Sequence, residues 1–134
     1  MLMSPDSWSG SLKFRLWLGE AVPNVGMIYE LRHYIPVPGK EAAILNRFKN
    51  HTFGIFKKNG FKTLNFWIDA KGSGQLWYVL GWESISSMES SWDTFRKDQE
   101  WIEAKEASEK DGPIVEKIES ILLTQPEDIA AAIA

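Results

Sequence analysis

The chain has 134 residues, and 44% of them are hydrophobic, including seven Trp and seven Phe, so it can bury a sizeable core within a single domain. Fifteen basic and eighteen acidic side chains give a formal net charge of −3, with no Lys or Arg cluster that could neutralise a row of phosphates, which argues against nucleic-acid binding. The absence of cysteine excludes disulfides and cysteine-based zinc sites, and no stretch approaches the roughly 20 apolar residues of a membrane span, so we expect a cytoplasmic protein without membrane insertion.

The first 26 residues show no sustained hydrophobic period and end in a turn-forming cluster of Pro, Asn and Gly. We therefore predict that a domain begins at Met27. Residues 1–26 are then an appended or poorly ordered extension, or the product of an over-extended reading frame. The alternative is an extra strand or arm that docks on the domain through its aromatic side chains.

From Ile28 to Tyr34 apolar and polar residues alternate, which predicts a strand, and the prolines and glycine of "IPVPGK" end it. After this turn the spacing of the apolar residues changes from every second residue to every third or fourth. Residues 40–59 place apolar side chains at helical spacing, which predicts one amphipathic helix that stops at Asn59-Gly60.

Two aromatic and β-branched runs follow, at 61–70 and 75–82, and the "KGSG" between them is typical of a hairpin loop. Apolar residues at three- and four-residue spacing then predict a second helix that begins near 85 and breaks near Asp98, with a capping box at Ser86 and Glu89. Residues 114–123 alternate again as a last strand, and residues 127–134 form a C-terminal tail.

The order β-α-β-β-α-β indicates an α+β, ferredoxin-like domain in which two helices cover one face of a four-stranded antiparallel sheet. Under the helices we expect Tyr29, Leu31, Leu64, Phe66, Ile68, Leu76, Tyr78 and Leu80. On the other face we expect Glu30, Arg32, Tyr34, Thr63, Asn65, Trp67, Asp69, Trp77, Val79 and Gly81. An uncovered face with two tryptophans is unusually aromatic for a monomer, so we predict a homodimer in which two sheets pack together or close into a barrel.

Several short motifs together resemble the NIPSNAP family. "YELRHY" is similar to the Tyr-Glu-Leu-Arg-x-Tyr strand with which the family's domain begins, and "PGK" opens the first helix. "HTFGIFKKNGFK", the Phe-Trp of "NFWIDA", "DQEW" and "ILLTQPE" extend the match over residues 27–126. The resemblance implies a dimeric α+β barrel of ferredoxin-like halves but no defined activity. Related barrels include cofactor-free monooxygenases of quinol-like aromatics and heme-binding or heme-degrading enzymes.

The polar face of the first strand is the first candidate site. Arg32 and Tyr34 could present a guanidinium and a phenol to an anionic or aromatic ligand inside the dimer. The candidate ligand-binding residues are Glu30, Arg32, Tyr34, Asn65, Trp67 and Trp77. The alternative is architectural, because a charge taken out of water needs a partner, and Glu30, Asp69 or Glu119 could pair with Arg32.

A pocket between helix and sheet is the second candidate, with His51, Tyr78 and Trp92 around an aromatic substrate. His51 lies near one edge of the first helix's apolar stripe and could act as a base or as an axial heme ligand. The alternative is a core histidine, because no second histidine, cysteine or carboxylate is spaced to support it. The stripe of Met88, Trp92, Phe95 and Trp101 is aromatic enough to suggest a cofactor box, but at helical spacing it is more typical of a core.

No catalytic triad, pair of catalytic carboxylates or metal-spaced cluster emerges from the sequence, so we predict no metal, no cofactor and no catalytic residue. The function we infer is that of a NIPSNAP-like homodimer that binds a small aromatic or anionic ligand. The alternatives are a small cofactor-free monooxygenase or heme-handling enzyme, and a structural partner-binding module. The sequence leaves open whether the chain is an enzyme.

Overall fold

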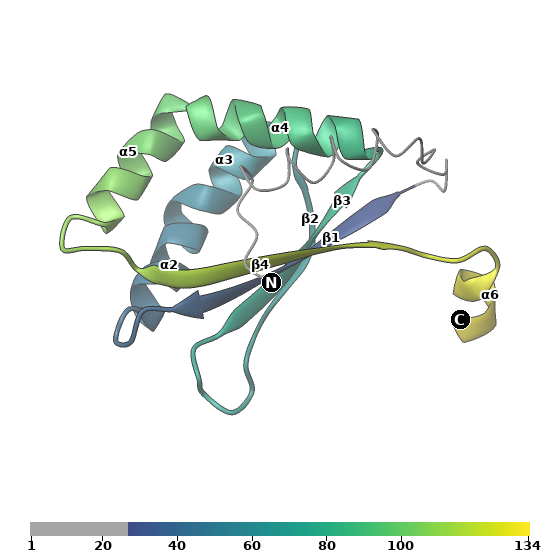
Figure 1. Ribbon diagram of the computed structural model, residues 1–134, viewed down its shortest axis with the longest axis horizontal. Helices are drawn as coiled ribbons and strands as arrows, with labels where there is room; N and C mark the ends of the chain where they lie inside the picture. Colours follow the sequence, from purple (N-terminus) through teal and green to yellow (C-terminus); the bar gives the residue numbers. More distant parts are fainter. Residues whose placement is uncertain (1–26) are drawn as a thin grey trace, which may run out of the picture.

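The computed structural model describes residues 27–134, and the expectations for residues 1–26 lie outside this range. Four strands, β1 (Ile28–Pro36), β2 (Lys62–Ile68), β3 (Leu76–Trp82) and β4 (Val115–Thr124), form one antiparallel sheet in the order β2-β3-β1-β4. The helices that connect them lie on one face of this sheet (Figure 1). The opposite face, which no described helix covers, is hereafter the open face. The α+β arrangement β-α-β-β-α-β is therefore confirmed.

The first helical region is one continuous run with a wide turn inside it. Its parts are α2 (Glu41–Arg47), the five-residue π-helical segment η1 (Phe48–Thr52) and α3 (Phe53–Lys58). The extent agrees with the predicted helix over 40–59, and Gly60 follows it in the left-handed conformation at φ 79°. The π segment was not predicted, because the apolar stripe in the sequence fits an unbroken helix.

The second helical region is broken at Asp98, as predicted. α4 (Ile85–Lys97) and α5 (Gln99–Ser108) flank this residue, whose backbone is extended at φ −67° and ψ 122°. The Asp98 carboxylate accepts a hydrogen bond from the Glu100 amide and so caps α5.

The predicted capping box is wrong by two residues. Ser84, which is extended, caps α4 together with Ser87, and Ser86 already lies inside the first turn. The C-terminal tail contains a short helix, α6 (Ile129–Ile133). Within residues 27–134 no helix has the length and apolar character needed to cross a membrane.

The two faces of β1 are the reverse of the prediction. Glu30, Arg32 and Tyr34 are buried under the helices, whereas alternate residues such as Leu31 are half-buried on the open face. The strand pairing explains this, because Arg32 lies opposite Tyr78 of β3 and directly opposed residues share a face. The polar residues of β1 therefore lie in the core of a single chain.

A β-bulge also changes the facing of β2. The register with β3 shifts between Thr63 and Asn65, which leaves Leu64 without a partner. Leu64 is 43% exposed and close to Gly81 on the open face, so its predicted place in the core is wrong. Ile68, at the end of the strand, is also exposed, and only Phe66 of the predicted trio packs against the core.

The core fills the space between the helices and the sheet. The first helical run contributes aliphatic and aromatic residues, α4 contributes an aromatic stripe, and β3 supplies the floor. Its most buried members include Ile44, Phe48, Ile55, Phe56, Leu76, Tyr78, Leu80, Met88, Trp92 and Phe95.

Candidate functional site

A buried ion pair lies on the helix-facing side of β1, where residues two apart in sequence are neighbours. Arg32 is 1% exposed and Glu30 is fully buried, and Arg32 Nη1 donates to Glu30 Oε2 over 3.1 Å. Arg32 also donates from Nε to the Tyr78 hydroxyl at 2.8 Å and from Nη2 to the Tyr34 hydroxyl at 3.4 Å. The guanidinium carbon Cζ lies 4.4 Å from the centroid of the Trp92 ring, a cation–π contact.

The Glu30 carboxylate accepts four hydrogen bonds. The indoles of Trp82 and Trp92 donate to Oε1 at 3.0 and 2.9 Å. The Ser120 hydroxyl, at 2.7 Å, and Arg32 donate to Oε2. The donors come from β1, β3, α4 and β4, so one carboxylate joins four elements. A buried charge is tolerated when it is paired and hydrogen-bonded, and Glu30 is both.

Burial and charge together set the ionisation of this cluster. Burial acts to lower the pKa of Arg32, but the two tyrosines and Glu30 outweigh it and hold that pKa well above its usual value. Burial raises the pKa of Tyr78 well above its usual value, against the opposing influence of Arg32. Arg32 is therefore a permanent cation and Tyr78 a neutral phenol at physiological pH.

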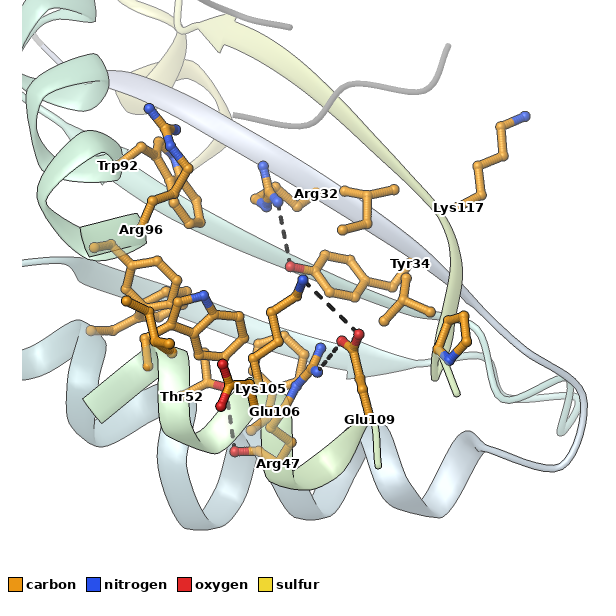
Figure 2. A pocket seen from close by; sticks show the side chains of 18 of the residues that line it. Arg32, Tyr34, Arg47, Thr52, Trp92, Arg96, Lys105, Glu106, Glu109 and Lys117 are labelled. Carbon is orange, nitrogen blue, oxygen red and sulfur yellow. Dashed lines mark hydrogen bonds and ion pairs between the residues drawn. The ribbon is translucent and has the colours of Figure 1, made fainter. Parts of the chain in front are cut away.

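A cavity of about 920 Å³ lies between the sheet and the helices, with Arg32 and Tyr34 of β1 at its floor (Figure 2). Hereafter it is the helix–sheet cavity. Its apolar walls contain six aromatic residues, Tyr34, Phe48, Phe56, Trp92, Phe95 and Trp101, and four other apolar ones, Ile102, Pro113, Val115 and Ile118. Five basic and three acidic side chains line it: Arg32, Arg47, Arg96, Lys105 and Lys117, and Glu106, Glu109 and Glu116. Several of the charged residues are exposed, so they form the mouth.

Arg47 links the two helical regions at this mouth. Its Nη1 donates to Ser108 Oγ at 3.1 Å and to Glu109 Oε2 at 3.0 Å, and its Cζ lies 5.0 Å from the Trp101 ring centroid. Lys105 Nζ lies 4.0 Å from the other oxygen of Glu109. These contacts form a charged rim above the aromatic walls.

The π-helical turn supplies part of the cavity wall. Arg47, Phe48 and Thr52 all line the cavity, and the Thr52 hydroxyl donates to the Arg47 carbonyl oxygen at 3.3 Å. π-helical turns occur frequently at functional sites. Arg47, Thr52 and Lys105 were not identified from the sequence, whereas Trp101 belongs to the aromatic stripe that was considered as a cofactor box. One signal was available, because Arg47 is a charged residue placed beside Phe48 in the helix's apolar stripe.

The structure brings together residues from both predicted sites. Arg32, Tyr34 and Trp92 line the helix–sheet cavity, and Glu30 and Tyr78 contact them directly. The other three candidates of the first site lie apart from them on the open face, and these are Asn65, Trp67 and Trp77. The first predicted site is thus divided by the sheet.

Neither histidine lines the cavity. His51 is exposed on η1, so its predicted orientation toward the sheet is wrong. His33 stacks on Trp77 on the open face, with ring centroids 4.4 Å apart, and its ring nitrogens contact Gln75 and Glu119. No imidazole is therefore placed to bind a heme iron in the cavity. Within residues 27–134 no three His, Asp or Glu side chains are grouped to hold a metal ion.

The fold and the cavity define the class of protein as an α+β domain of the ferredoxin-like type with a ligand-sized space between helices and sheet. The NIPSNAP family model matches residues 29–127, and the chain belongs to the NIPSNAP family.

Solved structures with the same fold include members of this family. An uncharacterized NIPSNAP-like domain protein from Burkholderia xenovorans has a TM-score of 0.68 at 16% identity, over 78% of this chain and 89% of that one. A NIPSNAP family protein with unknown function from Agrobacterium tumefaciens has a TM-score of 0.67 at 16% identity, over 79% and 94% of the two chains.

The fold extends beyond the family. A putative antibiotic biosynthesis monooxygenase from Nitrosomonas europaea has a TM-score of 0.57 at 6% identity, over 81% of this chain and 98% of that one. At such identities the similarity concerns the fold and not the chemistry. No curated protein matches the sequence.

Proposed function

We propose that this NIPSNAP protein binds a small organic molecule, aromatic or anionic, in the helix–sheet cavity. One observation carries the proposal: a buried arginine lies at the floor of an aromatic-walled cavity of about 920 Å³. Ligand sites typically have volumes of roughly 300–1,000 Å³ and combine apolar walls with a few polar groups.

Fluorescence titration with 8-anilinonaphthalene-1-sulfonate, an anionic aromatic probe, tests this function on the full chain. Ile118 of β4 lies opposite Tyr34 and lines the cavity, so Ile118→Trp fills the space that the probe needs. We expect saturable binding by the native chain that weakens about tenfold in this variant.

The matched control is the same substitution on the other face of the same strand. Ile121 is 53% exposed on the open face, opposite Leu31, and Ile121→Trp should leave probe binding unchanged. Binding that survives Ile118→Trp but is lost in Ile121→Trp would place the ligand on the open face. No saturable binding by the native chain would contradict the proposal.

A second candidate function is oxygenation of a quinol-like aromatic in the same cavity without a bound cofactor. Its support is the aromatic walls and the fold shared with the putative antibiotic biosynthesis monooxygenase. One oxygen atom of O₂ would enter the ring, and the other would leave as water with the two electrons and two protons of the quinol. Oxygen uptake with 1,4-naphthoquinol should exceed spontaneous oxidation and fall in Ile118→Trp. Uptake equal to the protein-free background contradicts this candidate.

We also propose that a second copy of the chain packs on the open face. The support is the exposed apolar area, which includes Leu64, Trp67, Ile121 and Leu123. Sedimentation velocity at micromolar concentration should show a dimer that dissociates in Ile121→Glu. Ile133→Glu, at another exposed apolar position in α6, is the control and should remain dimeric. A native chain that sediments as a monomer would contradict this assembly.

A further inference from the structure

The floor of the helix–sheet cavity presents hydrogen-bond donors that residues 27–134 do not use. A guanidinium carries five N–H groups and no acceptor. Three N–H groups of Arg32 donate hydrogen bonds, to Tyr78, Glu30 and Tyr34. One N–H on Nη1 and one on Nη2 therefore have no partner among the described residues, although Arg32 lines the cavity.

The two phenols add a third unused donor. The hydroxyl oxygens of Tyr34 and Tyr78 are 2.9 Å apart, so one hydroxyl donates to the other. Each also accepts from Arg32, which can only donate, so one phenol proton is left without an acceptor within residues 27–134. Tyr78 is fully buried and does not line the cavity, whereas Tyr34 does.

An unsatisfied donor is costly where no acceptor or water can reach it. We therefore assign the internal bond to the Tyr78 proton, which leaves the Tyr34 proton facing the cavity. Burial raises the pKa of Tyr78 well above its usual value despite the influence of Arg32, so this phenol keeps its proton. Figure 2 shows the Tyr34 hydroxyl and the Arg32 guanidinium directed toward each other at the cavity floor.

No acceptor in the cluster can reach these three donors. Glu30 already accepts four hydrogen bonds and does not line the cavity. The lining side chains also include two more basic than acidic groups, in a chain whose formal net charge is −3. The cavity therefore concentrates positive charge and donors where the protein as a whole is acidic.

We propose that the cavity selects organic carboxylates, with the carboxylate accepting hydrogen bonds from Arg32 and Tyr34 and the apolar body lying against the aromatic walls. The inference rests on the proposed ligand-binding function and names the ligand's class. A carboxylate offers two acceptor oxygens to the unused N–H groups of Arg32 and the Tyr34 hydroxyl. Because Glu30 already pairs with Arg32, the ligand's charge is offset by the excess of basic side chains that line the cavity. At the cavity floor a dianionic phosphate would bring a second charge that Arg32 alone does not match, and an amine would meet only the donors of Arg32 and Tyr34, because Glu106, Glu109 and Glu116 belong to the mouth.

Isothermal titration calorimetry with 4-phenylbutanoate and 4-phenylbutanamide tests the inference. The two compounds share an apolar body and differ in the head group. We expect the native chain to bind the acid about tenfold more tightly than the amide, in line with the greater strength of charge-assisted hydrogen bonds. The ratio of the two dissociation constants is the readout, because a change in apolar packing alters both constants together.

Tyr34→Phe removes only the cavity-facing hydroxyl and should reduce this ratio to about threefold. Tyr29→Phe is the matched control, because it removes a phenol hydroxyl from the open face of the same strand and should preserve the ratio. The double variant Glu30→Gln, Arg32→Gln removes both buried charges at once, so neither is left unpaired, and should bring the ratio to about one. If the double variant does not fold by circular dichroism, the two tyrosine variants decide the outcome.

Equal affinity for the acid and the amide overturns the inference and leaves the proposed function intact. An acid preference that survives in Tyr34→Phe and in the folded double variant also overturns it, because the acid is then recognised elsewhere. If neither compound binds while anilinonaphthalenesulfonate does, the carboxylate assignment fails alone. If none of the three compounds binds, the proposed function fails as well.

Discussion

The helix-covered face of the sheet buries a carboxylate, a guanidinium and two phenols, whereas the open face exposes Leu64, Trp67, Ile121 and Leu123. The difference shows that a side chain of this sheet is buried where hydrogen-bond or ion-pair partners are available, whether or not the side chain is polar. Trp82 and Trp92 bring indole N–H groups to Glu30 and so make a charged residue acceptable in the core. On the open face the apolar side chains have no covering layer among the described residues, and a second copy of the chain is our proposal for it.

Among the changes considered, replacing Glu30 by Ala on the helix-covered face should lower the free energy of unfolding most. The Arg32 charge would be left buried without its counter-charge, and we expect the free energy of unfolding to fall by about 3–5 kcal/mol. Urea unfolding measures this loss. The control is Glu116→Ala, at an exposed residue of β4 at the mouth of the helix–sheet cavity, which should stay within about 0.5 kcal/mol of the native chain. A loss below about 1 kcal/mol for Glu30→Ala would mean that water replaces the missing partner.

A smaller change tests whether the indole donors matter. Trp92→Phe keeps an aromatic ring in the core but removes one of the four hydrogen bonds to Glu30, which should cost about 2 kcal/mol. Trp101→Phe makes the same substitution at the half-buried rim of the cavity and should cost less than about 1 kcal/mol. Equal losses in the two variants would show that ring size, not the hydrogen bond, sets the effect.

Asp98 lies between α4 and α5 and is a half-buried carboxylate, in contrast to the fully buried Glu30. Hydrogen bonds from Asn59 and Lys58 lower its pKa from 3.8 to about 2. Because the folded value is the lower one, its stabilising contribution is complete above about pH 4 and is lost as the pH falls through about 2. Asp98→Asn should therefore flatten the fall in stability between these pH values. An unchanged pH profile, measured by urea unfolding, would contradict the shift, and Asp128→Asn in the tail is the control.

The smallest effect is expected on the open face. Ile121→Ala should change the free energy of unfolding by no more than about 0.5 kcal/mol at low protein concentration, because the side chain is already 53% exposed. If a second copy covers this face, the loss should increase with protein concentration. A loss of about 2 kcal/mol that does not depend on concentration would mean that the face is covered within one chain.

Most of the fold was predictable because it rests on local patterns. The period of two or 3.6 residues predicted the four strands and the two helical regions, and a break near Asp98 was predicted as well, whereas the π-helical turn and α6 were not. The facing of β1 was not predictable in this way, because its two alternating sets each contain one tyrosine and polar residues. Only the register, which pairs Arg32 with Tyr78, decides which set is covered, and register depends on contacts between distant segments.

The same reasoning explains the candidate site. Arg32, Tyr34 and Trp92 were identified as chemically able residues, but they were assigned to different sites. These three residues come together only because α4 packs on the sheet beside β1, and this packing cannot be read from the pattern of either segment alone. Leu64 was misplaced because a bulge adds one residue to a strand and reverses the alternation, and "KTLNFW" contains no glycine or proline to mark it.

The four-donor environment of Glu30 also bears on how the chain folds. Its partners lie on β1, β3, β4 and α4, so any partly assembled state that lacks one of these elements leaves a desolvated carboxylate short of donors. Partial structures are thereby disfavoured against both the complete domain and the hydrated, unfolded chain. We expect a single cooperative transition, in which tryptophan fluorescence and far-ultraviolet circular dichroism give the same urea midpoint.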